Sequence, residues 1–311
     1  MDCFRENYTV SFSDGMEYNK SKKRKQIRSY WSIFMREDYY TGRGVGVAIL
    51  DTGIWPHMDF GGRIRAFSDF ISYKKRPYDD NGHGTHVAGI LCGDGTASNG
   101  QYRGAAPGCG IVALKVLDRF GNGNKEDVLR SFQWLLKKRE TYGIRIVNIS
   151  VGTTYRTKRD HDILIRGVEE LWDAGLVVVC AAGNQGPSPG SVTAPGSSRK
   201  VITVGSSDML EGEGAVSGRG PTFDCVCKPD LVAPGSRIVS CAAGSHTYGI
   251  KSGTSMSTPL VSGTIARMLE KDPMLTNVEI KMMLKESAKD LGLPRNQQGW
   301  GEFDAERFLE L

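Results

Sequence analysis

The chain has 311 residues, 39% of them hydrophobic and 24% charged, with a formal net charge of +5 at pH 7. This length can bury a sizeable core without disulfides or metals, and the composition is that of an ordinary globular protein. No apolar run reaches the roughly 18 residues of a membrane-spanning helix, and the basic residues near the N-terminus are typical of a solvated segment. We therefore expect neither a membrane nor a nucleic-acid partner.

The first 40 residues differ from the rest of the chain. They are polar and basic, have no clear period, and lack the basic-then-apolar order of a secretory signal. Seven cysteines, an odd number without a repeating framework, indicate reduced thiols, and the pair Cys225 and Cys227 has no second pair with which to bind zinc. We expect residues 1–40 to be an N-terminal extension, a short leader or inhibitory segment. The location is predicted as cytoplasmic, or secreted if the sequence is a processed form.

From Gly44 onward, short apolar runs alternate with segments of helical spacing. The runs cover residues 45–50, 111–117, 144–149, 176–181 and 201–204, and helical spacing occurs around 128–136, 163–172, 255–270 and 277–289. This alternation predicts an α/β fold in which a parallel sheet is covered by helices on both faces. Residues 41–311 are predicted to form one domain, since they contain no repeat and no obvious linker.

Two polar residues lie where a parallel sheet of this kind is expected to bind a ligand. Asp51 directly follows the first apolar run, and ligands of open parallel sheets gather at the carboxyl ends of the strands. His83 lies in Asn81-Gly82-His83-Gly84-Thr85-His86, at the predicted start of a helix, where one ring nitrogen could hold Asp51 while the other accepts a proton. The alternatives are an ordinary strand-ending turn at Asp51, and for His83 a helix cap or half of a metal pair with His86.

A serine and an asparagine complete the set. Ser255 follows a Gly-Thr turn at a predicted helix N-terminus, where unpaired N–H donors and the helix dipole favour a developing oxyanion. Asn184 follows the 176–181 run on a tight turn, from which its amide could donate to the same oxyanion. Each residue alone has an ordinary role, as a capping serine or a turn asparagine. The chain order Asp, His, Asn, Ser favours acyl transfer, because the triad order Asp, His, Ser is that of subtilisin.

The motifs Ile49-Leu50-Asp51-Thr52-Gly53, His83-Gly84-Thr85-His86-Val87-Ala88-Gly89 and Gly253-Thr254-Ser255-Met256-Ser257-Thr258-Pro259 resemble those of the subtilisin-like serine proteases, the subtilases of peptidase family S8. The resemblance runs from about Gly44 to the C-terminus. It implies a three-layer α/β/α sandwich around a mainly parallel seven-stranded sheet. It also implies a serine endopeptidase with Asp51, His83 and Ser255 as its catalytic triad and Asn184 as an oxyanion donor.

The resemblance extends to substrate binding. It implies that Gly121-Asn122-Gly123 and Ser150-Val151-Gly152 pair with an extended substrate backbone by strand addition. It implies that Ala181, Ala182 and Gly183 line the S1 pocket, with Thr193 near its base. These segments carry no acidic cluster, whereas a pocket for Lys or Arg needs a carboxylate, so we expect broad specificity with a preference for large apolar P1 residues. The partners are then protein or peptide substrates, and the sequence leaves the oligomeric state open.

The resemblance implies no cofactor for the chemistry and raises Ca²⁺ as a structural ion. Asp59 lies near the position of one family ligand, but the loop expected to supply the other oxygens, residues 93–100, is longer and differently composed. Two further hypotheses remain beside the endopeptidase. One is a catalytically silent, peptide-binding subtilase scaffold, which a replaced triad residue would favour. The other is an esterase, which would need a Gly-x-Ser-x-Gly elbow and the order Ser, Asp, His.

Overall fold

The computed structural model describes residues 40–152 and 158–311. Its centre is a seven-stranded sheet of order β2-β3-β1-β4-β5-β6-β7, in which all neighbouring strands are parallel. The predicted seven-stranded parallel sheet is confirmed. Its strands are β1 (Gly46–Asp51), β2 (Ile64–Asp69), β3 (Gly110–Lys115), β4 (Ile144–Ile149), β5 (Val177–Ala181), β6 (Ile202–Ser206) and β7 (Leu231–Ala233).

The central strands are continuous apolar runs because both of their faces are covered. Every residue of β1, β3, β5 and β6 is buried. β-Branched residues dominate these runs and suit a pleated, packed surface. Burying each large aliphatic side chain contributes about 1.5–3 kcal/mol to the stability of the fold. The sheet therefore gives stable support to the residues at the ends of its strands.

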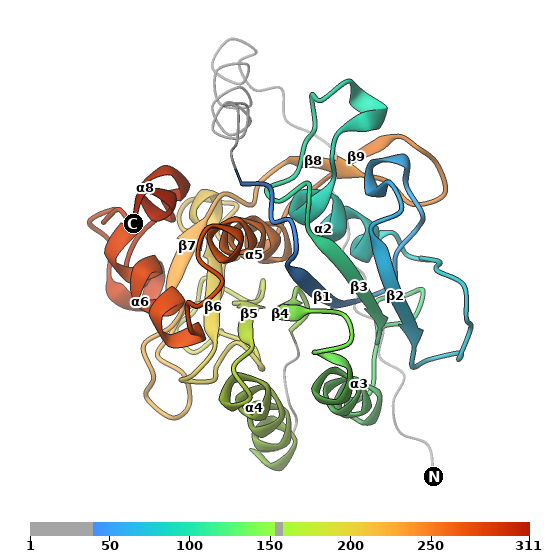
Figure 1. Ribbon diagram of the computed structural model, residues 1–311. Helices are drawn as coiled ribbons and strands as arrows, with labels where there is room; N and C mark the ends of the chain where they lie inside the picture. Colours follow the sequence, from blue (N-terminus) through green and yellow to red (C-terminus); the bar gives the residue numbers. More distant parts are fainter. Residues whose placement is uncertain (1–39, 153–157) are drawn as a thin grey trace.

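Helices cover both faces of the sheet (Figure 1). On one face α2 (His83–Cys92) packs against α5 (Thr254–Lys271), and on the other α3 (Lys125–Lys138) packs against α4 (Lys158–Asp173). The three-layer sandwich is thus confirmed. The C-terminal part adds α6 (Asn277–Ser287), α7 (Arg295–Gln298) and α8 (Ala305–Glu310), and single 3₁₀ turns lie at Met58–Phe60, Thr96–Ser98 and Ser207–Met209.

Three elements escape the sequence patterns. Strand β2 is an edge strand of mixed burial, and β7 has only three residues, so neither forms a recognisable apolar run. The antiparallel hairpin of β8 (Ile238–Cys241) and β9 (Tyr248–Lys251) is partly exposed and leads directly into the turn before α5. This hairpin packs on α2 and so joins the two helices that carry His83 and Ser255.

The order of the strands indicates where on the sheet the site lies. Strand β1 lies between β3 and β4, so the chain turns to opposite sides of the sheet on either side of it. Ligands of such sheets bind outside the carboxyl ends of the strands at this switch point. Asp51 ends β1, Ser150 follows β4 and Ala181 ends β5, so all three residues lie at one edge.

The domain limits remain a prediction, and nearly all of the 1–40 extension lies outside the described residues. At the start of the described chain, Glu270 of α5 accepts hydrogen bonds from the N–H groups of Thr41, Gly42 and Arg43. Within the two described ranges, no helix is long and apolar enough to cross a bilayer.

Candidate active site

Asp51 and His83 form the central contact of the site. Nδ1 of His83 lies 2.8 Å from Oδ1 and 3.0 Å from Oδ2 of Asp51. The Asp51 side chain is 1% exposed, whereas that of His83 is 25% exposed. The carboxylate therefore fixes the ring from the protein side and leaves its far edge toward solvent. Burial opposes the charged form of His83, but the charge and hydrogen bond of Asp51 outweigh it and raise the pKa of His83.

Asp79, which the sequence analysis missed, organises the start of α2. Its carboxylate accepts hydrogen bonds from the Gly82 and Thr85 N–H groups and from the hydroxyls of Thr52 and Thr85. Burial alone would raise the pKa of Asp79, yet these hydrogen bonds lower it, so the residue is ionised. Its negative charge also lies at a helix N-terminus, where the dipole favours it. An acidic residue four positions before His83 was the available signal.

A buried lysine supports the other side of the Asp51 turn. Nζ of Lys115, at the end of β3, donates to the carbonyl oxygens of Thr52 and Leu117 and to the carboxylate of Asp80 at 2.7 Å. A fully buried ammonium is costly unless it is paired. The sequence analysis placed this residue within the 111–117 run and assigned it no role.

His86 does not form a metal pair with His83. Its Nε2 contacts the carbonyl oxygens of Ile238 and Gly249 at 3.1 and 3.2 Å, and therefore carries the proton. Burial lowers the pKa of His86 to about 3. His86 is a neutral residue that holds the β8–β9 hairpin on α2, so the metal-pair alternative is wrong.

Ser255 is the second residue of α5, as predicted for a helix N-terminus. Its hydroxyl donates to the carbonyl oxygen of Ser150 at 2.8 Å, and the Ser150 hydroxyl donates in return to the Ser255 carbonyl at 3.1 Å. The serine is thus directed to the end of β4 and not to His83.

Asn184 is exposed, and its amide is oriented by Thr254. Oδ1 of Asn184 accepts from the N–H of Thr254 at 3.0 Å and from its hydroxyl at 3.1 Å. The Nδ2 donors are left facing the turn before Ser255, where a Cβ on Gly253 would lie 3.1 Å from Nδ2. Gly253 has φ 148°, a conformation that favours glycine. A glycine here also leaves space for the Asn184 amide.

The residues predicted for the S1 pocket come together. A Cβ on either Gly152 or Gly183 would overlap the hydroxyl of Thr193, so both backbones approach this side chain closely. The Thr193 N–H donates to the Ala182 carbonyl at 3.0 Å, and both Thr193 and Ala182 are buried. Ala181 is the last residue of β5 and is 2% exposed.

The segment 121–123 is an exposed loop. The N–H of Asn122 donates to the Asp118 carboxylate at 2.9 Å, and the Asn122 carbonyl accepts from the Asp118 N–H at 2.8 Å. Asp118 therefore closes the loop through Asn122 and fixes the shape of the glycine-flanked segment.

The residues around Asp59 do not fit a calcium ion. Oδ1 of Asp59 accepts from the Ala97 N–H at 2.8 Å, and Oδ2 accepts from the Tyr248 hydroxyl at 2.7 Å. The guanidinium of Arg63 donates to the carbonyl oxygens of Asp59 and Cys92 and forms an ion pair with Asp94 at 3.3 Å. Calcium needs six to eight oxygen ligands, whereas Arg63 occupies the nearby carbonyl oxygens and Asp94, and the groups beside the Asp59 carboxylate are an imidazole and a thiol.

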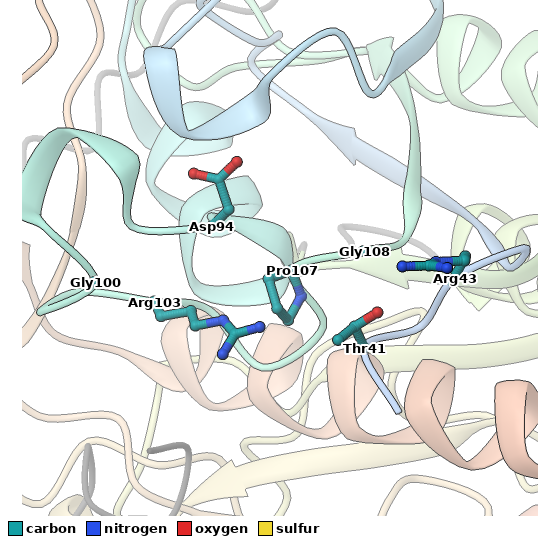
Figure 2. A pocket seen from close by; sticks show the side chains of 7 residues that line it. All are labelled: Thr41, Arg43, Asp94, Gly100, Arg103, Pro107 and Gly108. Atoms are coloured by element: carbon teal, nitrogen blue, oxygen red, sulfur yellow. The ribbon is translucent and has the colours of Figure 1, made fainter. Parts of the chain in front are cut away.

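A polar pocket lies beside Asp94 (Figure 2). Two arginines, Arg43 and Arg103, and the carboxylate of Asp94 lie around it, and none of the residues predicted for the triad, the oxyanion site or the substrate segments lines it. Its lining is completed by Thr41, Gly100, Pro107 and Gly108.

Comparison with known proteins agrees with this geometry. Residues 42–301 match the subtilase family of peptidases. The chain is 42% identical to "Serine protease AprX" of Bacillus subtilis, over 79% of this chain and 61% of AprX. It is 35% identical to "Subtilisin Savinase" of Lederbergia lenta, over 86% of this chain and 91% of that protein.

Two solved structures have the same fold. A cold-adapted subtilisin-like serine proteinase superposes with a TM-score of 0.70 at 30% identity, covering 86% of this chain and 89% of the other. Sphericase gives a TM-score of 0.74 at 27% identity, covering 89% and 96%. The chain belongs to the subtilase family of serine proteases. It spans about three fifths of AprX, 61%, and 39% of the B. subtilis protease Epr.

The Asp51–His83 contact predicts the titration of His83. In a Ser255→Ala background, which prevents self-cleavage, NMR titration of the His83 ring should give a pKa above about 6.5. Asp51→Asn should lower it below that value, because burial then acts without the opposing carboxylate. Asp224→Asn, which removes an exposed carboxylate outside the site, should leave it unchanged. A His83 pKa that is insensitive to Asp51→Asn would contradict the assigned electrostatics.

Proposed function

We propose that this chain is a serine endopeptidase that hydrolyses peptide bonds through an acyl-enzyme on Ser255. The observation that carries the proposal is the 2.8 Å contact between the buried Asp51 carboxylate and Nδ1 of His83, on a helix that packs against the helix of Ser255. Asp51 holds the ring so that Nε2 is the free nitrogen, and the neutral ring accepts the serine proton. The raised pKa of His83 favours the imidazolium that follows.

Substrate binding would also prepare the nucleophile. The Ser150 carbonyl, which holds the Ser255 hydroxyl, begins the segment proposed to pair with the substrate backbone. A substrate N–H that takes this carbonyl displaces the hydroxyl, which then turns to His83. The other pairing segment, Gly121–Gly123, keeps a fixed shape because Asp118 closes its loop.

Two donors would stabilise the tetrahedral intermediate. The Ser255 N–H belongs to the first turn of α5, whose donors have no partner within the helix. The Nδ2 group of Asn184 is the second donor, because Thr254 engages its Oδ1. A fixed donor aimed at the developing oxyanion acts with little reorganisation, which is the main advantage of such a site.

The P1 side chain would enter the space beside Gly152, Gly183 and Thr193. Among the described residues no carboxylate is recorded in contact with Thr193, whose hydrogen bonds go to the Ala182 backbone. A pocket of small, neutral groups favours large apolar P1 residues over Lys and Arg. The proposed substrates are protein or peptide chains in extended conformation.

No cofactor takes part in this chemistry, since subtilases carry it out with the triad alone. The position of Arg63 and the imidazole and thiol beside Asp59 argue against Ca²⁺ as a structural ion at this place. The silent-scaffold alternative has no supporting feature, because each triad residue is present. The cytoplasmic location and the role of residues 1–40 stay predictions; the six described cysteines, all free, agree with a reducing compartment.

Peptide hydrolysis tests the function. The wild-type chain should cleave an internally quenched peptide with Phe at P1 and should cleave the same peptide with Arg at P1 more slowly, because the pocket offers no countercharge. Ser255→Ala should abolish both reactions, and Ser252→Ala, in the same loop, should retain them. Cleavage of neither peptide would contradict the endopeptidase, whereas faster cleavage of the Arg peptide would contradict only the proposed pocket.

Asn184→Ala tests the oxyanion role. Loss of one donor should lower kcat by about 10²–10³ with little change in KM, because the interaction forms only in the transition state. Asp224→Ala is the control, since this exposed residue lies outside the proposed site. A raised KM with unchanged kcat would show that Asn184 binds the ground state.

A further inference from the structure

Outside the triad, the described part of the chain contains a buried cluster of a histidine, a carboxylate and a thiol. His57 and Asp59 belong to the turn after β1, and Cys241 ends β8. Their ligand atoms all lie within 4.8 Å of one another. The exposed fractions of His57, Asp59 and Cys241 are 3%, 0% and 1%. We propose that this cluster is a binding site for a thiophilic divalent cation of the Zn²⁺ type, held by Nδ1 of His57, a carboxylate oxygen of Asp59 and Sγ of Cys241.

The distances between the ligand atoms support this set. Nδ1 of His57 lies 3.6 Å from Oδ1 of Asp59, and Sγ of Cys241 lies 3.6 Å from Oδ2. Zinc bonds of 2.0–2.3 Å place tetrahedral ligands about 3.3–3.8 Å apart. The two distances involve different oxygens of the carboxylate, so His57 and Cys241 each lie at a suitable distance from Asp59. All three ligand atoms lie within 4.8 Å of one another, and small side-chain shifts would bring them to one ion.

The tautomer of His57 also suits a metal. Its Nε2 lies 3.1 Å from the carbonyl oxygen of Thr247 and so carries the ring proton. A metal-bound histidine typically donates its other N–H to a carbonyl in this way, which fixes the ring and the free lone pair. That lone pair, on Nδ1, now accepts a hydrogen bond from the Asp59 N–H at 3.2 Å, which coordination would replace.

Charge gives a further reason. The Asp59 carboxylate is fully buried, and its recorded partners are neutral donors: Ala97 N–H, the Tyr248 hydroxyl and the Cys241 thiol. Buried charges are normally paired or bound to metal. On binding, the Cys241 thiol loses its proton to solvent and the cation balances the thiolate and the carboxylate. Imidazole and thiolate ligands select zinc-like ions over calcium, which prefers oxygen alone.

The site would fasten the hairpin to the body of the protein. The Tyr248 hydroxyl, on β9 of the hairpin, lies 2.7 Å from Oδ2 of Asp59. Next to Cys241, the Ser240 hydroxyl donates to the His86 carbonyl at 2.8 Å on α2. A bound cation would thus link the turn after β1, the β8–β9 hairpin and α2. Its effect is on stability and does not depend on the proposed peptidase chemistry.

Cobalt provides a direct test, because thiolate ligation gives a charge-transfer band in the near ultraviolet. The protein is the full chain with Ser255→Ala, to prevent self-cleavage, and with Cys3, Cys225 and Cys227 changed to Ser, to remove competing thiols. Addition of Co²⁺ until the absorbance is constant should give this band with one ion per chain, and Zn²⁺ should remove it. Cys241→Ser should abolish the band, and Cys180→Ser, which removes a buried thiol of β5, should not.

Thermal unfolding provides the second readout. Zn²⁺ at about 100 times its dissociation constant should raise the Tm by at least about 5 °C, and His57→Gln should abolish this rise. If Cys241→Ser does not fold, loss of the cobalt band in His57→Gln decides the question. No band in the parent protein, or a band that survives Cys241→Ser or His57→Gln, would mean that the cluster is held by hydrogen bonds alone.

Discussion

The buried carboxylate of Asp51 is the constraint on which the site depends. It ends the central strand, where the chain turns to opposite sides of the sheet, and it contacts Nδ1 of His83 at 2.8 Å. An ionised group in this position is costly unless it is paired. The Thr52 N–H at 2.7 Å and the His83 ring satisfy it, and so tie the strand end to the first residue of α2. The orientation of the proposed base is therefore a consequence of satisfying a buried charge.

Two more buried ionic groups stabilise the same edge of the sheet. Asp79 binds the first turn of α2 and the Thr52 hydroxyl, while Lys115 binds the Thr52 carbonyl and Asp80. The hydroxyl of Thr52 also accepts from the Gly84 N–H at 2.9 Å, next to His83. These groups contribute no proposed chemistry. They hold the triad residues at fixed positions, which a catalytic site requires to within fractions of an ångström.

Most of the strands and helices that have a clear local pattern were predicted from the sequence. The apolar runs at 45–50 and 144–149 correspond to β1 and β4, and the Gly-Thr turn before Ser255 does precede a helix. Edge strand β2 could not be predicted, because its residues are only partly buried and its apolar pattern is interrupted by Arg65. The roles of Asp79 and Lys115 were equally hidden, since each depends on partners brought together by the sheet. The Ser255–Ser150 contact joins residues 105 positions apart and has no local signal.

The roles of the site residues were predicted from the resemblance of the motifs to a family. The structure differs from that prediction at the suggested calcium site around Asp59. Arg63 occupies carbonyl oxygens that a calcium ion could use, a difference that depends on a side chain outside the catalytic motifs. The same region instead places imidazole, carboxylate and thiol groups together. A family motif predicts the roles of its own residues, but it does not predict the side chains and contacts of the surrounding loops.

Ser255 is proposed to be an activated nucleophile, and covalent labelling tests this most directly. After incubation with a serine-directed fluorophosphonate, mass spectrometry of the peptides should locate a single adduct on Ser255. Asp51→Asn should slow labelling strongly, because the carboxylate then no longer orients the His83 ring or stabilises the imidazolium that forms. An unlabelled Ser255 in folded chains both with and without residues 1–40, or equal labelling of other serines, would contradict the account.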